Sequence, residues 1–245
     1  MSVYSPESMV AAIREFGVLP LFRSRIPGWS VEEMTAPGCW FDTEGVLGPW
    51  DWKVDAVRQG DIVYGKFIDG KAAFATLEWY RHLMNWRRSI PRYRMALGGR
   101  YKAVTNGDRQ IKAFAPEIMS AVKADGEIKA AGLRAICSKK SVYESVSRFL
   151  QMGTWLVVGD IEREYRGPNL TYSGWQRISL TTPDELFGGG KADPDAPAWV
   201  RLFESKTGQR EDIADCLPVE SRHIIIGHLR EIIPDADVQI LTKLI

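Results

Sequence analysis

Hydrophobic and polar positions in the first hundred residues follow a helical period and then a strand period. Residues 5–7 (Ser-Pro-Glu) are a typical helix start, and apolar residues then recur at helical spacing until Gly17. Residues 61–76 have strand-like patterning on both sides of Asp69-Gly70, a strong hairpin signal. The spacing also predicts two further helices, over residues 50–59 and 77–88. We expect this first unit to end among the breakers at residues 98–107.

A second unit follows with a clearer pattern. Its apolar spacing predicts three helices and then two strands: helices over residues 108–123, over 128–136 and from a cap at Ser141, then strands over 154–162 and 171–180. Pro116 is expected to kink or divide the first of these helices. Residues 163–170 form the predicted loop between the strands. Three helices followed by a two-stranded hairpin is the order of a winged helix, whose third helix can enter a major groove.

The remaining residues begin with a loop rich in glycine and proline and end in two predicted helices, over residues 220–232 and 237–245. The predicted fold class is therefore α+β, with tandem winged-helix units and a C-terminal helical extension. We expect a divergent winged-helix-like unit at residues 1–104, a winged-helix unit at 105–182, and a loop with helices at 183–245 packed on both.

Composition and charge limit the partners and the cellular location that we expect for this chain. Its 245 residues include 32 Lys and Arg against 31 Asp and Glu, a formal net charge of +1, so no global attraction to nucleic acid or membrane is expected. No apolar stretch reaches the ~20 residues of a membrane-spanning helix, and the first residues lack the pattern of a secretory signal. Three separated cysteines favour neither a disulfide framework nor a zinc ribbon. We therefore expect a cytoplasmic protein, whose oligomeric state the sequence leaves open.

The sharpest charge feature is a basic strip without any acid over residues 79–106. Its basic residues are Arg81, Arg87, Arg88, Arg92, Arg94, Arg100 and Lys102. Tryptophans and tyrosines are interleaved with them, which is typical of surfaces that contact phosphates and stack bases. The alternative is that acids elsewhere in the fold neutralise these arginines.

The predicted third helix carries a second basic group. Its polar face and the following loop offer Lys139, Lys140, Ser141, Ser145, Arg148, Arg163, Arg166 and Asn169 to a groove and its phosphates. Acids in the same region oppose such contacts: Glu144, Asp160, Glu162 and Glu164. The last three alternate along a strand, and we interpret them as a solvated strand face rather than as paired catalytic carboxylates. Because of these acids, a protein-binding module is an alternative use of the unit.

Motifs for other chemistry are incomplete in the sequence. His223 and His228 lie five residues apart, a spacing that does not bring both onto one helical face, so no metal site is expected. Residues 188–191 (Gly-Gly-Gly-Lys) lack the hydroxyl and the first glycine of a phosphate loop and are predicted to be a flexible loop. No serine or cysteine stands in a nucleophile elbow. We expect no cofactor.

Five short stretches of the chain carry a family resemblance. They are Trp50-Asp51-Trp52-Lys53, Tyr64-Gly65-Lys66, Lys71-Ala72-Ala73-Phe74, Phe149-Leu150-Gln151-Met152 and Leu156-Val157-Val158-Gly159-Asp160. These stretches resemble the AlkZ-related winged-helix proteins, bacterial relatives of the AlkZ/YcaQ DNA glycosylases. The resemblance extends over about residues 6–245 and implies a tandem winged-helix architecture and a DNA-linked role.

The glycosylases of this group carry a catalytic Gln-x-Gln or Gln-x-Asp motif just after the first helix. The best counterpart here is residues 17–22, which brings Pro20 and Phe22 to the two catalytic positions. Neither side chain can hydrogen-bond to water or activate it. Glycosylase activity is therefore not expected by inheritance, unless an acid from a neighbouring loop replaces the motif. Candidates for that role are Asp42, Glu44 and Asp51.

The leading hypothesis is a nucleic-acid-binding winged-helix protein without glycosylase catalysis, with DNA as the expected partner. Its predicted contact residues are Arg81, Arg87, Arg88, Arg92, Arg94, Lys139, Lys140, Ser141, Arg148 and Arg166. Two alternatives stay open: a DNA glycosylase acting on alkylated or cross-linked bases, and a protein-interaction module.

Overall fold

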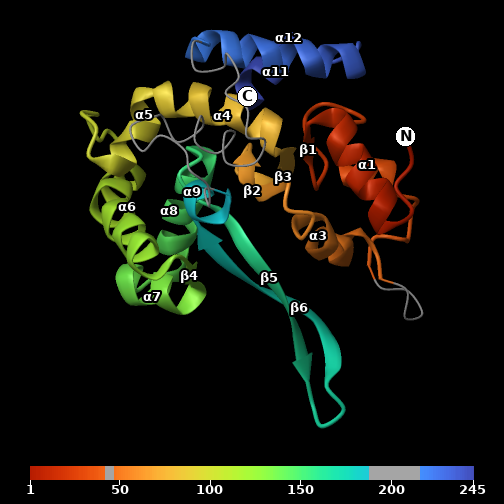
Figure 1. Ribbon diagram of the computed structural model, residues 1–245. Coiled ribbons are helices and arrows are strands. Elements are labelled where there is room, and N and C mark those ends of the chain that lie inside the picture. The colour runs from red at the N-terminus through yellow and green to blue at the C-terminus, as the bar shows by residue number, and fades with distance from the viewer. Residues whose placement is uncertain (42–46, 188–215) are drawn as a thin grey trace.

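The computed structural model describes residues 1–41, 47–187 and 216–245. Asp42, Glu44 and the loop predicted at residues 188–191 lie outside the described residues. The described residues form helices and two three-stranded antiparallel sheets, in agreement with the expected mixture of helix and sheet (Figure 1).

The N-terminal half contains three helices and one sheet. In chain order its elements are α1 (Pro6–Phe16), β1 (Val18–Pro20), α2 (Val31–Met34), α3 (Pro49–Val57), β2 (Ile62–Ile68) and β3 (Lys71–Thr76), with strand order β1-β3-β2. Ser5 caps α1 by accepting a hydrogen bond from the Ser8 backbone N–H at 3.2 Å. Asp69 and Gly70 both have positive φ, 52° and 67°, the turn that Asp-Gly favours in a hairpin. The predicted first helix and hairpin are confirmed.

The core of this half is aromatic. Trp29, Phe67 and Phe74 are fully buried, and the indole N–H of Trp29 donates to the Val18 carbonyl at 2.8 Å. The helix α4 (Leu77–Ser89) covers this core, as its predicted apolar spacing requires. A short helix α5 (Pro91–Arg94) and a 3-10 turn η1 (Met95–Leu97) follow it.

The C-terminal half begins with the longest helix of the described residues. Its elements are α6 (Asn106–Asp125), β4 (Ile128–Lys129), α7 (Ala130–Cys137), α8 (Lys140–Met152), β5 (Val157–Arg166), β6 (Thr171–Thr181) and α9 (Pro183–Phe187), with strand order β4-β6-β5. The helix α6 runs through Pro116 without a break, so the proline does not divide it.

Both halves have the same topology. Each runs helix, strand, helix, helix, strand, strand, and in each sheet the last strand lies between the other two. The halves differ in their hairpins, because β5 and β6 are 10 and 11 residues long whereas β2 and β3 are 7 and 6. The long β5–β6 hairpin projects away from the body of the molecule (Figure 1).

The predicted start of the second helix in this half is wrong. Ile128 and Lys129 form the strand β4, which pairs with Leu180 and Ser179 of β6, and the helix α7 begins only at Ala130. The pattern of residues 128–136 is compatible with a helix, but backbone pairing with a strand fifty residues away determines its first two residues.

Two further boundaries differ from the prediction. The helix α8 begins at Lys140 with Lys139 as its N-cap and no side-chain capping bond, so Ser141 lies inside the first turn and is not the cap. The strand β5 begins at Val157 rather than at Thr154, because Thr154 has φ 60° and cannot belong to a strand.

Two C-terminal helices pack across the end opposite the β5–β6 hairpin (Figure 1). They are α11 (Pro218–Ile232) and α12 (Val238–Leu244), and both were predicted. Asn85 of α4 donates to the buried Ser221 hydroxyl of α11 at 2.9 Å. Among the described residues, no helix is both long and apolar enough to span a membrane.

Candidate nucleic-acid interface

The basic strip at residues 79–106 does not form one surface. Arg81 and Arg87 point to the inner side of α4 and are only 4% and 3% exposed. The Arg87 guanidinium donates to four main-chain oxygens, those of Phe67, Met152, Leu244 and Ile245. Burial lowers the pKa of Arg87 from its ordinary value. The burial of both side chains leaves little of them open to a nucleic acid, which argues against their predicted role, and the Arg87 guanidinium instead ties main-chain oxygens of distant elements together.

The next arginines of the strip are engaged at its edge. Arg88 donates to the Thr154 carbonyl at 2.6 Å, and its guanidinium lies 4.4 Å from the ring centroid of Trp155. Arg92 pairs with Asp108 at 3.4 Å. Arg94 is exposed. Carbonyls, an aromatic ring and one acid therefore engage much of the strip, and the expected open face does not extend along its whole length.

The basic residues of α8 are on the surface. Lys139, Lys140, Ser141 and Arg148 are all exposed. One acid lies among them: Lys140 pairs with Glu144 at 3.7 Å, an exposed contact of small energetic weight. The apolar side of the same helix, with Val146 and Leu150 fully buried, packs into the core. The helix α8 thus presents a basic face to solvent along its length.

Two acids of the β5–β6 hairpin, Glu162 and Glu164, are paired with basic side chains. Glu164 accepts from Arg177 at 2.8 Å and from Arg166 at 3.2 Å, and these hydrogen bonds hold the pKa of Glu164 below its ordinary value. Glu162 pairs with Lys129 at 3.1 Å. The interpretation of these acids as a merely solvated strand face is therefore incomplete. Two arginines against one glutamate leave this part of the hairpin positively charged.

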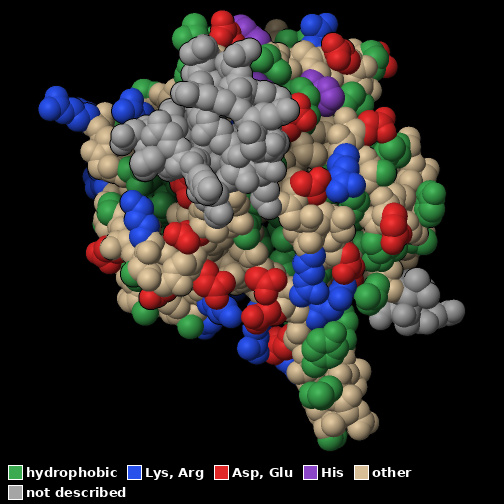
Figure 2. Space-filling model, viewed as in Figure 1, with side chains coloured by type: hydrophobic (Ala, Val, Ile, Leu, Met, Phe, Trp, Pro, Cys, Tyr) green, Lys and Arg blue, Asp and Glu red, His purple; other side chains and the backbone are tan. Residues whose placement is uncertain are grey.

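Large apolar side chains are exposed on the outer part of the hairpin. Trp175 is 65% exposed, and Tyr165 and Leu170 are exposed as well. Hydrophobic side chains are visible along this projecting part in Figure 2. Exposed aromatic and aliphatic side chains on a projecting element are typical of a surface that meets a partner.

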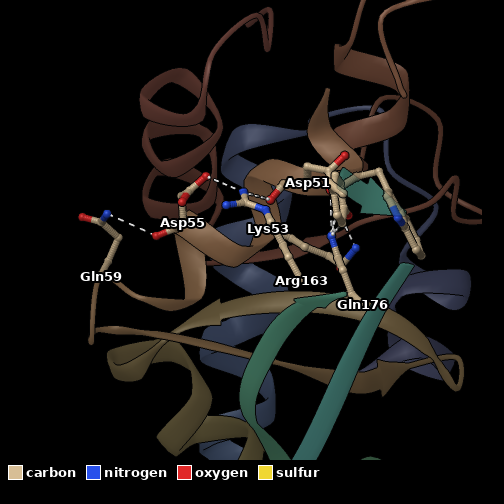
Figure 3. Close-up of polar contacts among 8 residues, drawn as sticks. Asp51, Lys53, Asp55, Gln59, Arg163 and Gln176 are labelled. Atoms are coloured by element: carbon tan, nitrogen blue, oxygen red, sulfur yellow. Dashed lines mark hydrogen bonds and ion pairs between the residues drawn. The ribbon is translucent and has the colours of Figure 1, made fainter. Parts of the chain in front are cut away.

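A polar network joins the hairpin to α3 (Figure 3). Asp51, only 2% exposed, accepts from the Gln176 amide at 2.9 Å and from the Tyr172 hydroxyl. Arg163 donates to the Asp51 carbonyl at 3.2 Å and to the Asp55 carboxylate at 3.3 Å. Burial and the bond to Asp51 raise the pKa of Tyr172 to about 12, so it stays a donor. The network fixes the hairpin against the third helix of the N-terminal half.

A buried lysine lies next to this network. Lys53 is 3% exposed, donates to the Trp50 carbonyl at 2.5 Å and lies with its Nζ 3.3 Å from the centroid of the Trp50 ring. Burial lowers the pKa of Lys53 to about 7, with a smaller opposing effect from Asp51. The amine therefore changes protonation near neutral pH.

The segment that corresponds to the glycosylase motif is packed. Pro20 is buried in β1 opposite Ala73. The Phe22 ring lies 5.7 Å from that of Trp40 and 6.2 Å from that of Trp50, centroid to centroid. Asp51, the one described candidate for a replacement acid, is buried and engaged by Tyr172 and Gln176. These residues form a packed aromatic and polar region that shows no acid open to a substrate.

Three residues in or beside the network were not selected as site residues by the sequence analysis, namely Lys53, Tyr172 and Gln176. One sequence signal for them exists. Asp51 and Asp55 are four apart on a helix, and Tyr172 and Gln176 are four apart on a strand, spacings that put each pair on one face. Nothing local indicates that the two faces meet. Among the described residues, no three His, Cys, Asp or Glu side chains are grouped as metal ligands.

The chain is thus a protein of helices and two small antiparallel sheets, with two halves of one topology, an exposed basic helix and a long hairpin. A model of the AlkZ-related family matches residues 3–245, and the chain therefore belongs to this family, which is distantly related to DNA glycosylases. The family resemblance is thereby confirmed. No curated protein and no solved structure matched the chain.

Proposed function

We propose that this protein is a cytoplasmic tandem winged-helix protein that binds duplex DNA through α8 and the β5–β6 hairpin, without glycosylase catalysis. The observation that carries the proposal is the exposed basic face of α8, formed by Lys139, Lys140 and Arg148 with the Ser141 hydroxyl. Such a face on the third helix of a winged-helix unit suits a major groove, where lysines contact phosphates and position the helix.

The topology of both halves supports the winged-helix part of the proposal. Each half has three helices, and the first strand of each lies between the first and second helix. In each sheet the third strand is central, as in a winged helix. The two units differ in how much of their third helix is open to DNA. Residues of the hairpin network contact α3, whereas α8 keeps its basic face exposed. The second unit is therefore the one that we expect to contact DNA.

The pairing of the hairpin acids also favours this function. Glu164 is neutralised by Arg166 and Arg177, and Glu162 by Lys129, so these acids repel a phosphate less than their count in the sequence indicates. Arg166 is 66% exposed in its side chain and can exchange its carboxylate partner for a phosphate.

Salt-dependent binding tests the proposal. Fluorescence anisotropy with a duplex is measured at several salt concentrations for the natural protein and for the variant Lys139→Gln/Lys140→Gln. Each phosphate contact contributes about 0.9 to the slope of log K against log salt, so the double variant should reduce that slope by about 2. A matched control, Lys112→Gln/Lys123→Gln, removes two exposed lysines of α6 and should leave the slope unchanged. Absence of binding, or binding indifferent to salt, overturns the proposal.

The catalytic part of the proposal has its own test. Pro20 and Phe22 offer no group that activates water, so incubation with alkylated or cross-linked DNA should release no free base. An active glycosylase run in parallel verifies the substrate. Release of a base with formation of an abasic site would establish the glycosylase alternative instead.

The exposed apolar residues of the hairpin favour a second candidate function, a protein-interaction module. The variant Leu170→Ser/Trp175→Ser separates the two. If duplex binding is unchanged in this variant while a stoichiometric protein partner is lost from nuclease-treated lysate, the hairpin serves protein binding. If duplex binding weakens and no such partner is found, the hairpin serves DNA.

A further inference from the structure

A small basic pocket lies where α4, α11, α12, the end of α8 and the β2–β3 turn meet, at the opposite end of α8 from Lys139 and Lys140. Its volume is about 160 Å³. Three basic residues line it, Arg87, Arg222 and Lys243, together with one acid, Asp69. Asp69 pairs with Arg25 at 3.3 Å, so its charge is already balanced by a residue outside the pocket lining.

Two of the basic side chains in the pocket pair with no acid among the described residues. The Ile245 main-chain oxygen accepts from Arg87 at 3.3 Å and from the Trp86 indole at 3.1 Å, so this oxygen is already engaged as a hydrogen-bond partner of Arg87. Arg222 and Lys243 form no ion pair with the described residues. Arg222 and Lys243 line the same pocket, and since like charges repel each other, an anion bound there relieves their repulsion.

Arg222 is held in a fixed orientation. Its guanidinium lies 4.7 Å from the ring centroid of Trp86, and one of its terminal N–H groups donates to the Thr242 carbonyl. Its Nε is buried and has no hydrogen-bond partner among the described residues. The ring contact and the bond to Thr242 therefore hold the guanidinium at the wall of the pocket.

We propose that this pocket binds the phosphate group of a phosphomonoester. The volume is below the 300 Å³ or so of a pocket for a drug-sized ligand, which limits the buried part to a small group such as a phosphate. Arg222 and Lys243 together match the charge of a phosphate dianion, whereas a carboxylate balances only one of them. The planar guanidinium of Arg222 is suited to paired N–H contacts with phosphate oxygens.

Calorimetric titration at low ionic strength tests the site, with inorganic phosphate, a nucleoside 5′-monophosphate and acetate as probes. Phosphate and the monophosphate should bind, and acetate should bind at least about tenfold more weakly. The variants Arg222→Gln and Lys243→Gln should each raise the Kd for phosphate about tenfold, the effect of one lost charged hydrogen bond. Lys243 is exposed, so its variant reports on the site even if Arg222→Gln disturbs the packing on Trp86. The control Lys112→Gln/Lys123→Gln should bind phosphate normally.

Duplexes with and without 5′-phosphates identify the source of the group. If a 5′-phosphate tightens duplex binding in the natural protein but not in Lys243→Gln, the ligand is a nucleic-acid end; if it has no effect, the ligand is a small phosphoester. Lys243→Gln should leave binding of an unphosphorylated duplex unchanged, so a failure of this site is distinguishable from a failure of the proposed DNA-binding face. Phosphate that binds no better than acetate, or with equal affinity to the natural protein and both variants, overturns the proposal.

Discussion

The stability of a Lys53 variant minus that of the natural chain should be larger at neutral and acidic pH than at alkaline pH. Lys53 is buried beside Trp50, and its pKa falls from the ordinary 10.5 to about 7. Between these two values the unfolded chain binds a proton that the folded chain does not bind. Stability therefore rises with pH across this range, and below pH 7 the folded chain bears the full cost of a buried charge.

The magnitude follows from the same two values. A difference between pKa 10.5 and about 7 corresponds to roughly 5 kcal/mol in the free energy of unfolding when it is fully expressed. Between about pH 6 and about pH 10, roughly 4 kcal/mol of this should appear. The variant Lys53→Met keeps most of the side-chain volume and removes the titration. It also removes the bond to the Trp50 carbonyl and the contact with the Trp50 ring, which shifts the comparison by a constant.

The assay is urea unfolding of the natural protein and of Lys53→Met at several pH values. The stability of the variant minus that of the natural protein should fall by roughly 4 kcal/mol from about pH 6 to about pH 10, while titrations of other groups cancel. Lys112→Met, at an exposed position on α6, is the control and should show a difference that does not depend on pH. A pH-independent difference for Lys53→Met would refute the reasoning, since it would mean that Asp51 or water stabilises the charged amine fully.

Three further predictions concern stability and are checked by urea or thermal unfolding. Arg87→Met should cost about 3–5 kcal/mol, because it leaves four main-chain oxygens without their buried charged donor; a cost below about 1 kcal/mol would contradict the role of Arg87 as an internal tie. Gly17→Ala should cost more than about 2 kcal/mol, since Gly17 has φ 65° and a Cβ there would lie 2.2 Å from Trp79. Thr105→Ala should cost about 1 kcal/mol by removing the cap of α6, whereas Ser120→Ala on its exposed side should be neutral.

Local sequence signals predicted the long elements of the fold well. The cap at Ser5, the Asp69-Gly70 turn and the apolar stripe of α6 each act within a few residues, and the structure contains all three. The strand β4 was missed because its two residues have no strand pattern of their own. Their conformation depends on pairing with β6, and no local signal carries that information.

Some of the candidate contact residues are exposed and others are buried, for a similar reason. Sequence spacing placed Lys139, Lys140 and Arg148 on the polar side of a helix, and they are exposed. The same reasoning failed for Arg87, because α4 is packed on more than one side and the main-chain oxygens that surround its guanidinium come from three other elements and the last residue. A run of arginines thus indicates positive charge in the sequence but does not indicate which charges face solvent.

The network at Asp51 suggests how the N-terminal half serves the proposed DNA-binding face. Its third helix α3 is held by Tyr172, Gln176 and Arg163 of the hairpin, so this half fixes the hairpin relative to α8. The variant Tyr172→Phe removes the hydroxyl that donates to Asp51 and should cost about 1–2 kcal/mol of stability. It should also increase amide hydrogen exchange along the hairpin.

Binding to a duplex should respond to Tyr172→Phe in a way that identifies positioning rather than contact. The affinity should fall several-fold at every salt concentration, because a mobile hairpin must be ordered on binding, whereas the slope against salt should stay unchanged, because no phosphate contact is lost. Tyr165→Phe, on the exposed outer part of the same hairpin, provides the control and should match the natural protein. If Tyr172→Phe instead reduces the slope as Lys139→Gln/Lys140→Gln does, the tyrosine hydroxyl belongs to the contact surface. The N-terminal half would then contribute to DNA contact rather than only orient the hairpin.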